Sequence, residues 1–159
     1  MTPIEALQQV KLAYLRELDK LIKEKESRRQ WYENKAFELL HLPTAVKFVL
    51  PHDEFGNPVY GLAERVDGRN IISIKPCLPL EEERFTFVHE VSHFLLGHVE
   101  EITRSEREQG KIMREGLLSG AFNKATGLDA KKMYQDAYAK REHDANTLGL
   151  ELHKLLWQD

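Results

Sequence analysis

Two histidines and a glutamate stand at a spacing that could put metal ligands and a proton acceptor side by side. The segment reads His89-Glu90-Val91-Ser92-His93, an H-E-x-x-H pattern. On a helix, residues four apart lie about 6 Å apart along the axis and about 40° apart around it, so both imidazoles can reach one ion. Glu90 would then lie beside that ion as a general base. The pattern is typical of zinc-dependent hydrolysis.

An ion held by two histidines needs a third protein ligand and an open position for water, and two histidines with a glutamate are one established set. We favour Glu142, because it lies far enough along the chain for a final helix to pack across the motif helix. Asp144 is the alternative in the same segment. Asn146, four residues after Glu142 on the same face, could orient one imidazole through its free ring nitrogen.

His98 competes for the same role, because some zinc proteases carry a third histidine six residues after the second. In this chain it follows His93 by five residues. On a continued helix it would point about 180° away from His89. We therefore interpret His98 as a histidine at the surface or at the helix end.

The elements that must position these side chains begin with a long helix. Thr2-Pro3 is a typical helix start, with a capping residue before proline. Apolar residues then recur at helical spacing: Ile4, Leu7, Tyr14, Leu18, Leu21 and Ile22. The mixed charges between residues 20 and 29 predict a solvated face, with a docking surface for a partner as the alternative. Helical structure should continue to about Leu42, before Pro43.

Three strands are predicted next, over residues 45–50, 59–66 and 70–75, because β-branched and alternating apolar residues are bounded there by turn residues. Asp67-Gly68 predicts a tight turn that pairs the second and third strands antiparallel. Pro79 and three glutamates predict that the motif helix begins near Leu80 and ends near Gly97.

The remaining chain predicts a charged, exposed helix over residues 100–115 and a loop or lid over 116–127. A long helix should run from Leu128 to the C-terminus. The fold class expected is α+β, with a small three-stranded antiparallel sheet, a long N-terminal helix, the motif helix and a C-terminal helix that carries the third ligand. We expect one domain over residues 1–159, comprising an N-terminal helical segment (1–43) and a core (44–159).

Bulk properties exclude several classes of protein. The net charge is −3, so no basic surface is available and direct nucleic-acid binding is not expected. No apolar run is long enough to span a bilayer, so no membrane association is expected. Cys77 is the only cysteine, which fits a reducing, cytoplasmic location, and we expect it to pack as a small apolar residue.

One ordered set of motifs resembles a known family. The segment 85–98 reads FTFVHEVSHFLLGH, follows an isoleucine-rich strand and precedes the Glu142-x-Asp144-Ala145-Asn146 segment. Together these resemble the ImmA/IrrE family of metallopeptidases, over about residues 45–156. The resemblance implies a minimal zincin-like fold in which His89, His93 and Glu142 bind Zn²⁺ and Glu90 is the catalytic base.

Members of that family are often carried by mobile elements or bacteriophage and act on helix-turn-helix repressors. The resemblance therefore implies a zinc-dependent intracellular endopeptidase that cleaves a specific protein, a transcriptional repressor, and so regulates transcription. The residues that could stabilise the transition state stay open, with four candidates on the final helix: Tyr134, Tyr138, Arg141 and His143.

A function of another class stays open as well. The charged helix over residues 11–30 could make this a metal-binding module, of an antirestriction or anti-defence type, that acts by sequestering a protein partner without catalysis. Replacing Glu90 by alanine would separate the two hypotheses, because only catalysis needs that carboxylate.

Overall fold

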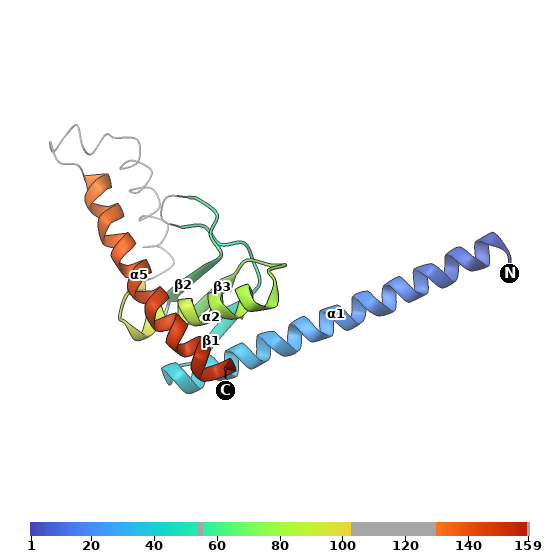
Figure 1. Cartoon of the computed structure of the whole chain (residues 1–159), viewed down its shortest axis with the longest axis horizontal. Helices are drawn as coiled ribbons and strands as arrows, with labels where there is room; N and C mark the ends of the chain where they lie inside the picture. Colours follow the sequence, from blue (N-terminus) through green and yellow to red (C-terminus); the bar gives the residue numbers. More distant parts are fainter. Residues whose placement is uncertain (54–55, 103–129, 159) are drawn as a thin grey trace.

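The computed structural model describes residues 1–53, 56–102 and 130–158 of the chain (Figure 1). Its elements, in chain order, are α1 (Pro3–Leu40), β1 (Thr44–Lys47), β2 (Gly61–Val66), β3 (Arg69–Ile74), α2 (Leu80–Leu95), β4 (Glu101–Ile102) and α5 (Ala130–Trp157). The predicted α+β class is confirmed. Within the described ranges, no helix is long and apolar enough to cross a membrane.

The sheet is mixed, and this corrects the predicted three-stranded antiparallel arrangement. Its strand order is β1-β3-β2-β4. β2 and β3 pair antiparallel, as predicted, through a turn in which Asp67 and Gly68 both have positive φ. β1, however, runs parallel to β3 on its other edge. Residues 48–60 separate β1 from β2, and a connection of that length lets the chain cross to the far edge instead of forming a hairpin.

Two further local predictions were wrong. The first strand ends at Lys47 and not at Leu50. Glu101 and Ile102 form β4, which pairs parallel with Arg65 and Val66, where the sequence predicted the start of an exposed helix. A two-residue strand has too little sequence for any pattern to reveal it. The rest of that predicted helix, and the predicted loop or lid, lie outside the described residues.

Helix α2 lies at the centre of the molecule, and its apolar side chains form the middle of the core. Phe87, Val88 and Val91 are fully buried. The Phe87 ring packs on the ring of Tyr32 from α1, with centroids 4.6 Å apart. The other buried core residues come from α1, the sheet and α5: Ala36, Val46, Ile72, Ile74 and Leu152. All these elements therefore depend on α2 for their packing.

A buried carboxylate joins α1 to the start of α2. The Glu83 side chain accepts hydrogen bonds from Arg28 Nε at 3.0 Å and from Tyr32 Oη at 2.7 Å. Burial of the Tyr32 phenol and its hydrogen bond to Glu83 raise the pKa of Tyr32, so the hydroxyl stays protonated and donates. The bonds from Arg28 and Tyr32 to Glu83 fix the C-terminal half of α1 against α2.

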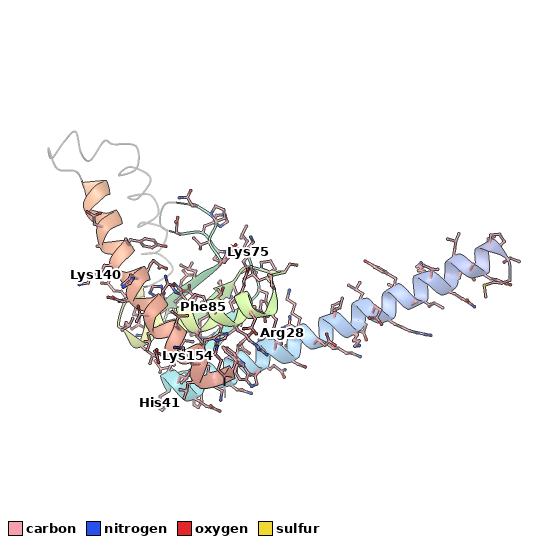
Figure 2. All side chains as sticks on the ribbon, in the orientation of Figure 1. Arg28, His41, Lys75, Phe85, Lys140 and Lys154 are labelled. Atoms are coloured by element: carbon pink, nitrogen blue, oxygen red, sulfur yellow. The ribbon has the colours of Figure 1, made fainter. Side chains whose placement is uncertain are left out.

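The N-terminal half of α1 extends away from these packed elements (Figures 1 and 2). Its first turn is closed by a capping box, in which Thr2 Oγ1 accepts from the Glu5 amide and the Glu5 carboxylate accepts from the Thr2 amide. Every residue from Met1 to Glu24 is exposed except Ala6. The apolar residues that predicted this helix therefore lie in solvent, together with its charged face.

Cys77 does not pack as predicted. Its side chain is exposed, and its backbone has a φ of 64° in the turn that follows β3. Turn geometry, which a single cysteine in the sequence does not reveal, decides its exposure.

Candidate metal centre

The H-E-x-x-H segment is helical, as the chemistry requires. It lies in the C-terminal half of α2, where every residue from Thr86 to Phe94 is buried. Apolar side chains at Phe87, Val88 and Val91 pack into the core, and this packing sets the rotation of the helix. The two histidines are therefore held on the opposite side, facing α5.

Three ligand atoms converge between α2 and α5. Oε2 of Glu142 lies 2.7 Å from Nε2 of His89, and Oε1 of the same carboxylate lies 3.0 Å from Nε2 of His93. The two imidazole Nε2 atoms are 3.2 Å apart. The structure thus brings together the three side chains that the sequence predicted as ligands. Asp144, the alternative third ligand, lies outside this cluster.

The donor set fits a zinc ion. Zinc in proteins binds histidine nitrogen and carboxylate oxygen at about 2.0–2.2 Å in a tetrahedral arrangement, so neighbouring ligand atoms lie about 3.3 Å apart. The distances between His89, His93 and Glu142 are 3.2, 3.0 and 2.7 Å, all shorter than that value, so the three side chains lie close enough together to share one ion. Three protein ligands also leave a fourth tetrahedral position, which a water or a substrate could take.

His89 and Glu142 change each other's pKa values in this cluster. Burial opposes protonation of His89, but its hydrogen bond to Glu142 and the charges of Glu90 and Glu142 outweigh burial and raise the pKa of His89. Burial also disfavours a charged Glu142, yet the hydrogen bonds from His89 and His93 lower the pKa of Glu142 to about 2. The carboxylate of Glu142 is therefore ionised at neutral pH, as a group that binds a cation must be.

Glu90 occupies the position expected of a base beside the ion. Its side chain is 4% exposed, and Oε1 lies 3.8 Å from Nε2 of His89. Gly61, at the start of β2, makes room for it. A Cβ at Gly61 would lie 2.9 Å from Cγ and Oε1 of Glu90 and 2.6 Å from Cγ2 of Thr86. Only glycine lets β2 approach Glu90 this closely, and no spacing pattern in the sequence marks this position.

Gly149 lies where α5 contacts α2, although a Cβ would fit there. An added Cβ would lie 3.4 Å from the His89 backbone N and Cα, so the two helices are in close contact at this point. Because Glu142 is two helical turns before Gly149, this approach brings the carboxylate within reach of the imidazoles. A glycine within a helix that is not required for a turn is the sequence signal that could have identified it.

His98 is placed by the way α2 ends. Gly97 adopts a φ of 73°, the Gly97 amide donates to Phe94 O, and the His98 amide donates to His93 O at 2.9 Å. This is a Schellman motif, which folds the chain back over the last turn. Nδ1 of His98 consequently lies 3.0 Å from Nδ1 of His93, the ring nitrogen directed away from the cluster. His98 thus contacts a ligand instead of being one, and its contact can orient the ring of His93.

Asn146, which we expected to orient an imidazole, is exposed. It lies near enough to His89 to favour the protonated ring slightly. It does not satisfy Nδ1 of His89, which is buried and makes no hydrogen bond of normal geometry to any described residue. The predicted contact is therefore only partly present.

The comparison with protein families agrees with this geometry. Residues 48–153 match peptidase family M78, the IrrE N-terminal-like domain, so the match covers two thirds of the chain. The chain belongs to this family. The resemblance to ImmA/IrrE proteins is confirmed. No curated protein and no solved structure matches the chain significantly.

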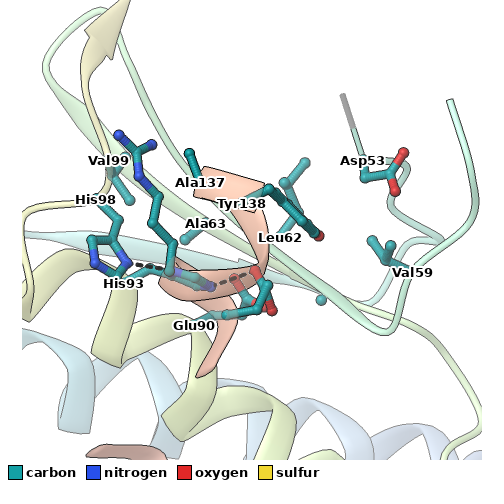
Figure 3. A pocket seen from close by; sticks show the side chains of 13 residues that line it. Asp53, Val59, Leu62, Ala63, Glu90, His93, His98, Val99, Ala137 and Tyr138 are labelled. Carbon is teal, nitrogen blue, oxygen red and sulfur yellow. Dashed lines mark hydrogen bonds and ion pairs between the residues drawn. The ribbon is translucent and has the colours of Figure 1, made fainter. Parts of the chain in front are cut away.

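The peptidase-family site opens into a cleft between β2 and α5 (Figure 3). Glu90, His93 and Glu142 lie along the cleft, with Gly61 to Ala63 of β2 on one side. Of the four candidates for transition-state stabilisation, Tyr138 and Arg141 line the cleft, and the exposed His143 does not. Tyr134 has no described side chain. Among the candidates whose side chains the structure describes, the cleft therefore favours Tyr138 and Arg141.

Proposed function

We propose that this protein is a zinc-dependent endopeptidase with His89, His93 and Glu142 as ligands and Glu90 as the general base. The observation that carries the proposal is the convergence of these three ligand atoms beside a buried glutamate, in a chain of peptidase family M78. When bound, zinc supplies Lewis acidity, which lowers the pKa of water and polarises a carbonyl.

The residues of the chain supply the remaining steps. Glu90 accepts the proton of the attacking water at its carboxylate and can pass that proton to the amide nitrogen that leaves. Tyr138 and Arg141, on the α5 side of the cleft, are placed to donate to the oxygen on which negative charge develops. Burial keeps competing solvent away from Glu90.

The edge of β2 supports an extended polypeptide as substrate. Among the described residues, Gly61 to Ala63 pair with β3 on one edge, whereas the strand pairing with β4 on the other edge involves Arg65 and Val66. A peptide segment can add to such an edge through backbone hydrogen bonds. The same stretch lines the cleft beside Glu90, so a peptide bound there would present its carbonyl groups to the base.

The substrate we propose is a helix-turn-helix transcriptional repressor of a mobile element or phage, cleaved in the cytoplasm. A cytoplasmic protease without specificity would harm its host, and the net charge of −3 gives this chain no basic field for DNA. Any effect on transcription would therefore pass through a separate DNA-binding protein.

Two measurements test the proposal. Metal analysis of protein purified without added zinc should find about one zinc ion per chain in the wild type and in Glu90→Gln, and none in His89→Ala. The helix-turn-helix repressor encoded beside the gene should be cleaved by the wild type, and Glu90→Gln should cleave at least about 100-fold more slowly. Chelation should stop cleavage, and added zinc should restore it.

The outcomes separate catalysis from sequestration. Cleavage at the wild-type rate by Glu90→Gln would contradict the assigned base. An unchanged biological effect of Glu90→Ala, with the repressor left intact, would instead favour the metal-binding module that acts by sequestering its partner. Retention of zinc by His89→Ala would contradict the metal centre itself.

A further inference from the structure

The exposed half of α1 carries an apolar stripe. Placed at 3.6 residues per turn, eight large apolar residues of this segment fall within about 140° of the helix circumference, and Leu12 lies outside that range. The eight are Ile4, Leu7, Val10, Tyr14, Leu15, Leu18, Leu21 and Ile22. Their side chains are 40–70% exposed. The part of α1 that carries them extends away from the other elements (Figure 2). A stripe of this length on one helix face is typical of an interface.

The spacing of the stripe is that of a coiled-coil seam. Ile4 and Leu7, Lys11 and Tyr14, and Leu18 and Leu21 occupy successive a and d positions of a heptad repeat. The seam stops where α1 reaches the packed elements, because Lys25 lies over the Phe48 ring and Arg28 bonds Glu83. The exposed seam is about 27 Å long, from the rise of 1.5 Å per residue.

We propose that residues 4–22 of α1 bind the same residues of a second copy of this chain as an antiparallel coiled coil. In the matching register Ile4 packs against Leu21 of the partner subunit, Leu7 against the partner's Leu18, and Lys11 against the partner's Tyr14. Each pairing occurs twice, as a two-fold symmetric interface requires. The N-terminus of each helix then ends beside residue 21 of the other, before the packed elements begin.

Charge decides the orientation of the helices. A parallel pair would place Lys11 against the partner's Lys11 at an a position, so that like charges oppose each other in the seam. An antiparallel pair instead places Lys11 on the face of the partner's Tyr14 ring, an attractive cation–π arrangement.

The mass of the chain in solution tests this interface. Sedimentation equilibrium of the full chain, at concentrations from 1 to 100 μM (about the range of ordinary dimers), should approach twice the 18.5 kDa mass of one chain. Leu18→Glu, within the stripe, should keep the mass near 18.5 kDa at every concentration. Leu12→Glu is the matched control, because Leu12 is 53% exposed on the opposite side of α1 and should leave the dimer intact.

Crosslinking tests the orientation in a Cys77→Ser background, which removes the exposed native thiol. Mixing Ile4→Cys protein with Leu21→Cys protein should give a disulfide-linked heterodimer, and Ile4→Cys alone should give none. A linked Ile4→Cys homodimer would overturn the antiparallel arrangement. A monomer at all concentrations, or equal effects of Leu18→Glu and Leu12→Glu, would overturn the dimer. Circular dichroism of each variant should match the wild type, because all five positions are exposed.

Discussion

Helix α2 buries charged side chains, whereas the exposed half of α1 leaves large apolar side chains in solvent. In α2, ten of the 16 residues are buried, and they include two glutamates and both histidines of the candidate metal centre. In α1, the large apolar residues before Glu24 are all exposed. Burial of charged groups is costly unless they are paired or bind a metal, and exposure of a long apolar stripe is unfavourable unless a partner covers it. The ion and the second copy of the chain that we propose would account for these two departures from an ordinary fold.

The largest loss of stability should come from a substitution that leaves a cavity in the core around α2, the buried element of this comparison. Phe87→Ala removes a fully buried ring that packs on Tyr32, and it should lower the free energy of unfolding by about 3–5 kcal/mol. Urea unfolding followed by circular dichroism measures it. A loss below about 1 kcal/mol would mean that α2 is not the centre of the core.

A smaller effect should come from Gly61→Ala, which tests how closely the sheet approaches the base. The new Cβ would overlap Thr86 and Glu90, so we expect a loss of about 1–3 kcal/mol in unfolding free energy and slower cleavage with zinc still bound. Thr86→Ser removes the nearest atom, at 2.6 Å, and should recover part of both losses. Gly149→Ala is the control, because its nearest atoms are 3.4 Å away and alanine favours the helix.

If the double variant Gly61→Ala/Thr86→Ser were no better than Gly61→Ala, the contact with Thr86 would not be the cause. Loss of zinc from Gly61→Ala would show that the strand also positions the ligands, and the base alone would no longer explain the slower cleavage.

The pH dependence of metal-free protein should show the ionic pairing of the centre. Glu142 has its pKa lowered from 4.5 to about 2, so its ionised form stabilises the fold above pH 4.5, and this stabilisation is lost as the pH falls from 4.5 toward 2. His89 has a raised pKa, so its contribution is complete below 6.5 and is lost as the pH rises above that value. The pair should therefore contribute most between about pH 4.5 and 6.5.

Unfolding free energies of chelator-treated wild type and Glu142→Gln check this at pH 3, 5.5 and 8. The advantage of the wild type should be greatest at pH 5.5. An advantage that is equal at all three values would contradict the pairing of Glu142 with the imidazoles.

The smallest effects should come from α1 itself when the chain is dilute. At concentrations well below the dissociation constant of the dimer, Leu18→Ala and Leu12→Ala should each change the free energy of unfolding by less than about 0.5 kcal/mol, because both side chains are already in solvent. At high concentration only Leu18→Ala should destabilise, and thermal unfolding at two concentrations measures the difference. If the unfolding temperatures of the two variants depended equally on protein concentration, Leu18 would not differ from Leu12 as an interface residue.

Much of the site was predictable because its spacing is local. His89 and His93 are neighbours on any helix, and Pro79 with its glutamates identified the start of that helix correctly. Glu142 was predicted by its segment and is placed as predicted. Gly61 and Gly149 were missed, because each depends on the distance between parts of the chain that no periodic pattern relates. The contact between His98 and His93 was missed because the prediction placed His98 on a continued helix, whereas Gly97 turns the chain back.

The sequence by itself determined the helices, the antiparallel pairing of β2 with β3 and the donor set, since propensities, turn residues and periodic spacing act within a few residues. Only the tertiary structure decided that β1 joins the sheet in parallel and that the apolar face of α1 stays in solvent. The reason is physical: burial and strand order depend on which distant segments can meet, and an amphipathic pattern is the same whether its apolar face meets its own core or another chain.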